Sequence, residues 1–100
     1  MTYSLFYFSD VSLDAKEAKF WYKSHQLGLE KRFADTIKSC ILKVQENPFN
    51  YAVHYRNVRI AHPKVFPYSV HFYIDEQSKQ IVIVAIIHNK RNPETVQKRI

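Results

Sequence analysis

The sequence predicts a single α+β domain over residues 1–100, in which a helical hairpin packs on one face of an antiparallel sheet. Two observations carry this prediction. Apolar residues recur with a helical period between residues 11 and 44, and with a period close to two beyond residue 57. The chain has the length of one domain, and its 46% hydrophobic content is ample for a packed core. The expected order of elements is βααβββ.

The first half of the chain predicts one strand and two helices. Residues 3–8 alternate with many aromatic side chains, as in a strand, and Ser9 or Asp10 is placed to cap the helix that follows. One stripe of that helix should contain Val11, Ala15, Ala18 and Tyr22, with Trp21 beside it in the core. The only glycine, Gly28, separates this helix from a second one.

The second helix should be longer than the first. Its apolar stripe consists of Leu29, Phe33, Ile37, Ile41 and Val44. Asn47-Pro48 ends it, since proline disfavours a helical conformation in the residue before it. A short break between two apolar stripes predicts an antiparallel hairpin of helices. On the outer side of the first helix, Lys16, Lys19 and Lys23 are expected to face solvent.

The second half of the chain predicts three strands. Residues 51–57 are interpreted as an irregular or extended connector. Residues 58–64 form a strand in which Pro63 indicates an edge or a bulge, and residues 68–74 form the next strand, directly after Pro67. Residues 81–87, "IVIVAII", are apolar on both faces, which is typical of a central strand covered on both sides. Two helices cover only one face, so either the tail or a binding partner should cover the other.

The charge of the chain is unevenly placed. The formal net charge is +6, and residues 51–100 hold eight Lys and Arg against three Asp and Glu, together with four of the five histidines. A basic half of this kind favours an anionic partner, although plain solubility remains an alternative. The single Cys40 excludes a disulfide framework and fits a reducing cytoplasm. No signal peptide and no membrane span is expected.

Three stretches of the chain contain motifs whose order and spacing match those of a known protein family. They are "AKFWYKSHQLGLEKRFADTI", "NVRIAHPKVFPYSVHFYID" and "IVIVAIIHNKRNP", which include Trp21-Tyr22, Arg59, Phe66-Pro67-Tyr68 and the ending from His88 to Pro93. Together they resemble the RelE/ParE superfamily of toxins from bacterial type II toxin–antitoxin systems, and the ParE-like branch most. The resemblance covers nearly the whole chain.

The resemblance implies a βααβββ toxin that is neutralised by a cognate antitoxin, often through a strand added to the sheet. ParE-like members are associated with poisoning DNA gyrase and with plasmid stabilisation, whereas RelE-like members cleave mRNA on the ribosome. A gyrase inhibitor in the cytoplasm is therefore the preferred interpretation. The alternatives are a ribosome-dependent mRNA endonuclease and a non-toxic relative that still binds an antitoxin. No cofactor is implied.

Cleavage of RNA without a metal requires an acid–base group and fixed cations. If the protein is a nuclease, His88, Arg59 and Arg91 are the candidate catalytic residues. RelE-like nucleases usually carry an aromatic residue or a histidine near the C-terminus, but residues 89–100 contain neither. The sequence therefore leans towards a protein that is not an enzyme.

A binding role depends on basic residues instead. The candidates for contact with the target or the antitoxin are Arg59, Lys64, Arg91, Lys98 and Arg99. The orientation of Arg59 stays open, between a partner and an ion pair with an acidic residue of the helical hairpin. A turn centred on Phe66-Pro67 places His62 opposite His71 on an exposed face. Two histidines are too few to hold a metal, so no metal site is predicted.

Overall fold

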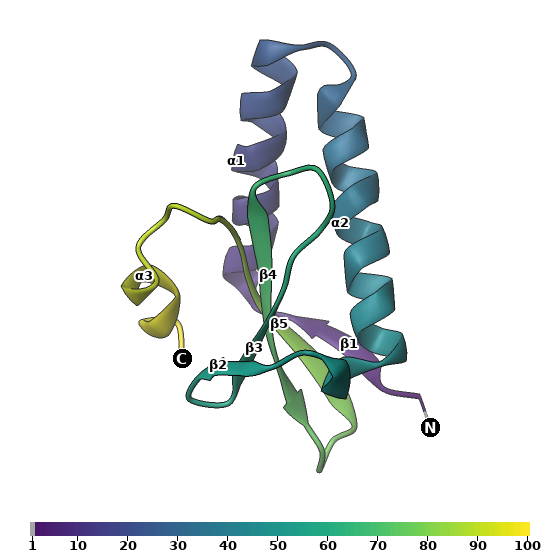
Figure 1. The fold of residues 1–100 in the computed structure, drawn as a ribbon. Coiled ribbons are helices and arrows are strands. Elements are labelled where there is room, and N and C mark those ends of the chain that lie inside the picture. Colours follow the sequence, from purple (N-terminus) through teal and green to yellow (C-terminus); the bar gives the residue numbers. More distant parts are fainter. Residues whose placement is uncertain (1) are drawn as a thin grey trace.

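The computed structural model describes residues 2–100, which form a helical hairpin, a five-stranded sheet and a short C-terminal helix (Figure 1). The elements are β1 (Ser4–Tyr7), α1 (Ser9–His25), α2 (Leu29–Glu46), the 3₁₀ turn η1 (Pro48–Asn50), β2 (Val53–Tyr55), β3 (Val58–Ala61), β4 (Tyr68–Asp75), β5 (Gln80–His88) and α3 (Glu94–Gln97). The predicted α+β class with a hairpin on the sheet is confirmed. No described helix has the length and apolar character that crossing a membrane requires.

The sheet has the strand order β1-β5-β4-β3-β2. Strand β1 pairs with β5 in parallel, and all other pairs are antiparallel. Strand β2 was not predicted, because residues 51–57 were interpreted as a connector. The strand has only three residues, of which Val53 and Tyr55 pair with β3, and a tight turn follows at Arg56, which has a φ of 48°. So short a strand carries too little alternation to be recognised.

Helix α1 differs from the prediction at its start and on its buried face. Its N-cap is Phe8, without a side-chain hydrogen bond, and neither Ser9 nor Asp10 caps it. The buried residues are Val11, Asp14, Ala18 and Tyr22. Ala15 of the predicted stripe is half-buried and packs against the main core, but the structure also buries Asp14, so an acidic side chain faces the sheet. Lys16, Lys19 and Lys23 are exposed, as predicted.

The main core lies between the hairpin and one face of the sheet. Gly28, with a φ of 91°, provides the left-handed turn that reverses the chain before α2. The side chain of Phe33 is 1% exposed and packs against the rings of Tyr22, Phe66 and Tyr68. Phe33 is therefore a core residue, as predicted.

The C-terminal tail covers part of the second face of the sheet. Helix α3 places the fully buried Val96 against Val84, Ala85 and Ile87 of β5. Asn92 accepts a hydrogen bond from the backbone N–H of Glu94 at the start of this helix. Strand β5 is buried on both faces. The sequence left open whether the tail or a partner covers the second face, and in the structure the tail covers part of it.

The loop between β3 and β4 turns sharply before the Phe66-Pro67-Tyr68 motif. Val65 has a φ of 75°, and the N–H of Phe66 donates to the carbonyl of Lys64 at 2.9 Å, which closes a three-residue turn. A β-branched residue is strained in this region. The side chain of Phe66 then enters the core, and Pro67 directly precedes β4.

The register of the β3–β4 hairpin corrects two expectations. Strand β3 ends at Ala61, short of the predicted residue 64, and His71 pairs with Ile60 instead of His62. The loop is therefore longer than a turn centred on Phe66-Pro67 allows. His71 is also 4% exposed, whereas the sequence placed it on an exposed face. The tail and β2, both distant in sequence, account for this burial.

Candidate functional site

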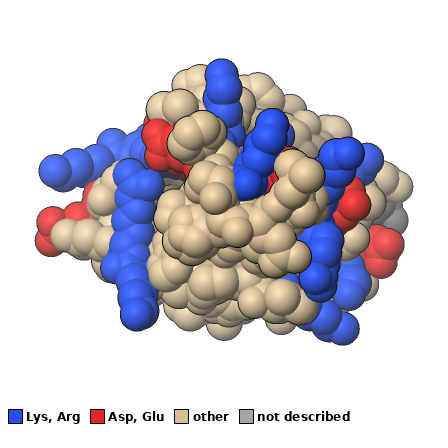
Figure 2. Space-filling view, turned by 90° about the horizontal axis from the view of Figure 1, so that it is seen from above, with Lys and Arg blue, Asp and Glu red and all other residues tan. Residues whose placement is uncertain are grey.

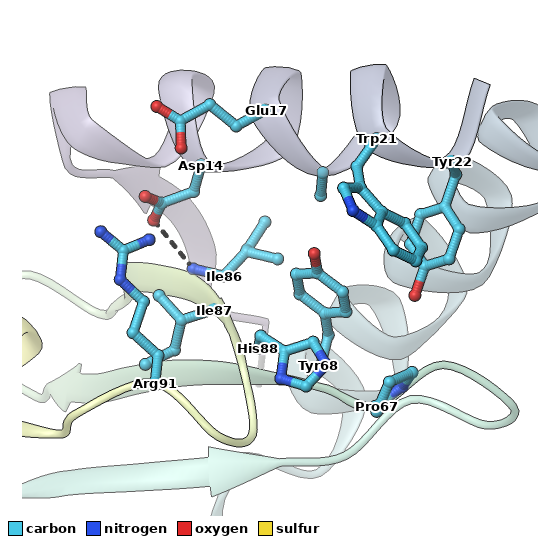
Figure 3. A pocket seen from close by; sticks show the side chains of 11 residues that line it. Asp14, Glu17, Trp21, Tyr22, Pro67, Tyr68, Ile86, Ile87, His88 and Arg91 are labelled. Carbon is cyan, nitrogen blue, oxygen red and sulfur yellow. Dashed lines mark hydrogen bonds between the residues drawn. The ribbon is translucent and has the colours of Figure 1, made fainter. Parts of the chain in front are cut away.

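A groove of about 450 Å³ lies between α1 and the end of β5 (Figure 3). It is lined by side chains from α1, from the start of β4 and from the turn after β5. The lining residues are Asp14, Glu17, Ala18, Trp21, Tyr22, Pro67, Tyr68, Ile86, Ile87, His88 and Arg91. We refer to it as the β5 groove. It brings together the family motifs that the sequence placed far apart.

A bulge in β5 determines which residues face the groove. His71 of β4 pairs with Ala85 and the next residue, Phe72, pairs with Ile83, so Val84 has no partner on β4. Strict alternation beyond Ile83 would turn His88 towards the second face of the sheet. The extra residue reverses the alternation, and His88 therefore faces α1.

A buried ion pair between Asp14, which lines the groove, and Arg99 lies at one side of it. The two terminal nitrogens of the Arg99 guanidinium, Nη1 and Nη2, donate to the carboxylate of Asp14, at 2.6 and 2.8 Å. Asp14 also accepts the N–H of Ile86 at 3.1 Å, and Arg99 donates to the carbonyl of Val84 at 3.1 Å. The hydrogen bond to Asp14 raises the pKa of Arg99. The side chains are 5% and 12% exposed, so the pair is shielded from water.

This pair substitutes for a missing strand. The backbone of β1 accompanies β5 only as far as Ile83, whose carbonyl accepts the N–H of Phe8. Beyond that point the polar groups of Val84 and Ile86 have no strand beside them. Asp14 and Arg99 satisfy these groups with their side chains, as burial requires. We refer to Asp14 and Arg99 as the clasp.

His88 and Arg91 stand at the open end of the groove. The N–H of Lys90 donates to Nδ1 of His88 at 3.1 Å. Because a backbone N–H only donates, Nδ1 is an acceptor, and the proton of the neutral imidazole is on Nε2. The ring of His88 lies edge-on to that of Tyr68, with a centroid distance of 5.3 Å. His88 can therefore donate a hydrogen bond from Nε2 to an anion or a carbonyl.

Two aromatic residues shape the inner part of the groove. Tyr68 is half-buried, and desolvation raises the pKa of its phenol, with Arg91 acting in the opposite direction. Trp21 is 52% exposed and stacks on His25 at a centroid distance of 3.8 Å. The prediction that Trp21 belongs to the core is wrong, whereas its neighbour Tyr22 is buried. A residue next to a helical apolar stripe can lie either on the buried or on the exposed face of the helix.

The structure separates Arg59 from the groove. Its guanidinium donates to the carbonyl of Tyr51 at 2.7 Å and lies 5.2 Å from the ring centroid of Phe49. It pairs with Phe72, four residues along β4 from Tyr68, which is about 13 Å at the usual strand rise. Within residues 2–100 Arg59 forms no ion pair with the hairpin. The ion pair with the hairpin is thus replaced by a contact with η1 and its flank, whereas a contact of Arg59 with a partner stays a prediction.

The remaining predicted contact residues are scattered. Lys64 is exposed in the β3–β4 loop and Lys98 is exposed after α3. Arg99 belongs to the clasp. Of the whole predicted set, the β5 groove brings together only His88 and Arg91. Sequence reasoning missed the part that Glu17 and Tyr68 play in lining the groove, although Tyr68 was already part of a quoted motif.

Basic side chains outnumber acidic ones in the chain, with 15 Lys and Arg against nine Asp and Glu. In the view from above, Lys and Arg side chains project around the molecule and acidic side chains are few (Figure 2). Among residues 2–100, no three His, Cys, Asp or Glu side chains are grouped so that they could hold a metal ion. The groove offers hydrogen-bond donors, the guanidinium of Arg91 and the exposed ring of Trp21.

Comparison with known proteins identifies relatives of this chain. Residues 11–93 match the model of a family described as the ParE toxin of the type II toxin–antitoxin system parDE. The fold is similar to a solved chromosomal ParDE system from P. aeruginosa, with a TM-score of 0.75 and 18% identity over 87% of this chain and 96% of that one.

A second solved structure is similar in fold. It is the toxin–antitoxin complex RelBE2 from Mycobacterium tuberculosis, with a TM-score of 0.62 and 15% identity over 88% of this chain and 99% of that one. A search of curated proteins gives no match. At these identities the solved structures support the fold, and the family match rests on the sequence.

Proposed function

This chain belongs to the ParE toxin family of type II toxin–antitoxin systems, and we propose that it arrests growth by binding DNA gyrase. One observation carries the choice of a binding mechanism. The three residues that a nuclease would need are not assembled, because Arg59 contacts η1 about 13 Å along the sheet from His88. His88 and Arg91 remain as donors for a contact with the target. Gyrase is cytoplasmic, so we place the toxin there.

A supercoiling assay with purified gyrase tests this proposal. The variant Arg91→Ala should need about tenfold more toxin for the same inhibition, because a charge-assisted hydrogen bond is worth about 1.5–3 kcal/mol. Lys16→Ala is the matched control, since it removes one exposed charge from the outer face of α1. If the unmodified toxin leaves supercoiling unchanged, gyrase is not the target.

The second part of the proposal is an antitoxin that neutralises this toxin by docking beside β1. The outer edge of β1 has no neighbouring strand among the described residues. An apolar groove of about 280 Å³ runs between this edge and the hairpin, and its lining includes Leu5, Ile37 and Leu42. Lys19 and Lys38 also line it. An extended segment with apolar and acidic side chains would complement such a groove.

Co-expression with the adjacent antitoxin gene tests the docking site. Leu42→Glu introduces a negative charge into the groove and should prevent the antitoxin from restoring growth. Leu13→Glu is the control, because Leu13 is similarly exposed on α1 and does not line the groove. If both variants are neutralised like the unmodified toxin, the antitoxin docks elsewhere. Normal growth without any antitoxin would show that the protein is not toxic.

An mRNA endonuclease is the second candidate function. The observation that favours it is the grouping of His88, Tyr68 and Arg91 at one end of the β5 groove. In a translation extract, such an enzyme would cleave mRNA, and His88→Ala would abolish the cleavage. That result would overturn the gyrase proposal.

A further inference from the structure

A second pocket lies on the other side of β5 from the β5 groove. Its volume is about 230 Å³, and strands β2, β3, β4 and β5 line it together with the tail. The lining residues are His54, Ile60, His62, Ser69, His71, Ile87, His88, Asn89, Arg91 and Pro93. Four of the five histidines of the chain are among them, and no carboxylate is. We refer to it as the histidine pocket.

The floor of the pocket is formed by the buried His71, which is hydrogen-bonded to Tyr55. Nδ1 of His71 and the hydroxyl of Tyr55 are 2.9 Å apart. Nε2 of His71 makes no hydrogen bond within residues 2–100. This nitrogen is nevertheless not fully buried, so solvent or a ligand can reach it. When the phenol of Tyr55 donates, Nε2 carries the proton of the neutral ring. The pocket then contains a fixed N–H donor on its floor.

A short polar chain forms the opposite wall. The Ser69 hydroxyl donates to the side-chain carbonyl of Asn89, so its oxygen accepts from Nδ1 of His62 at 3.2 Å. This arrangement leaves the amide N–H₂ of Asn89 available as a donor to a ligand, whereas Nε2 of the neutral His62 ring is an acceptor. His54 and His62 are exposed, so a ligand can reach both imidazoles.

These groups together favour an anion. Burial lowers the pKa of His71 to about 4, with His54, His62 and Arg99 acting in the same direction and Asp14 opposing them. His71 therefore stays a neutral donor near pH 7. Arg91 provides a permanent positive charge, and no carboxylate lines the pocket to repel an anion.

We propose that the histidine pocket binds a phosphate group of a single-stranded nucleic acid. The pocket adjoins the β5 groove, because both are lined by Ile87, His88 and Arg91. In the β5 groove Trp21 is 52% exposed and stacks on His25 with one face, so a neighbouring base can stack on the other. A strand with alternating bases and phosphates fits this succession of aromatic and cationic surfaces better than an acidic peptide, whose side chains do not stack. The inference does not depend on gyrase as the target.

Fluorescence anisotropy with a labelled single-stranded oligonucleotide of about ten nucleotides tests the inference on the free toxin. The double variant His54→Gln/His62→Gln should bind about tenfold more weakly at pH 6 and should differ little from the unmodified toxin at pH 8, because an imidazole, unlike an amide, can gain a positive charge in this range. Glutamine keeps an amide donor, and both positions are exposed, so the fold should be preserved.

The control variant is Lys16→Gln/Lys23→Gln, which removes two charges from the outer face of α1. Its affinity should stay within about twofold of that of the unmodified toxin at both pH values. An equal loss in both double variants would mean that only the overall charge attracts the oligonucleotide, and the pocket would be refuted. Competition by a glutamate-rich peptide as strong as that by inorganic phosphate would assign the pocket to carboxylates and overturn the nucleic-acid assignment.

Discussion

The clasp leads to a sharp prediction about stability. Asp14→Asn keeps an oxygen that can accept the N–H of Ile86, but it removes the charge that pairs with Arg99. The guanidinium of Arg99, 12% exposed, would then be buried without its main partner. Breaking one side of a buried pair costs about 3–5 kcal/mol. The total free energy of unfolding of a domain is about 5–15 kcal/mol, so the variant should lose a large part of its stability.

Urea unfolding followed by circular dichroism measures this loss. The expected decrease in the free energy of unfolding is about 4 kcal/mol, or about 15–30 °C in melting temperature. Asp10→Asn is the matched control, because Asp10 also contacts Arg99, at 3.4 Å, but is 55% exposed. Its effect should stay below about 1 kcal/mol. If Asp14→Asn costs no more than Asp10→Asn, the clasp does not hold the tail and our reasoning is wrong.

Two other predictions concern His71 and Val65. The pKa of His71 is lowered to about 4 in the folded state, chiefly by burial. The unfolded chain therefore binds this proton first, and stability should fall by up to about 3 kcal/mol between pH 6.5 and pH 4. Urea unfolding across this range should show a smaller pH dependence in His71→Gln, and an unchanged dependence would exclude His71 as its source. Val65→Gly should raise the unfolding free energy by about 1 kcal/mol, since the φ of 75° costs glycine nothing and the side chain is 80% exposed. A destabilised glycine variant would show that the turn is not strained.

The helical hairpin was predictable from local signals. The apolar stripe of α2, the stop at Asn47-Pro48 and the single Gly28 each act over a few residues, and the structure has each of them in place. The doubly apolar run of β5 likewise predicted a central strand with both faces covered. Such patterns depend only on the hydrophobic period within one helix or strand, so neighbouring residues in the sequence are enough to show them.

The candidate site was only partly predictable. His88 and Arg91 stood out as a strand-end pair within a family motif, and the structure places both at the β5 groove. The same motif-based reasoning grouped Arg59 with them, but the register of β3 on β4 separates it. Register depends on the length of the β3–β4 loop and on the strained turn at Val65, and neither is visible in the alternation of a strand.

The sequence by itself determined the class of fold, the order of its main elements and the family, because these depend on local periodicity and on motifs in order. Only the tertiary structure decided how the two ends of the chain meet. The clasp joins Asp14 to Arg99, which lie 85 residues apart. The bulge at Val84 turns His88 towards α1. Both are responses of buried polar groups to neighbours that are distant in sequence, so no local pattern contains them.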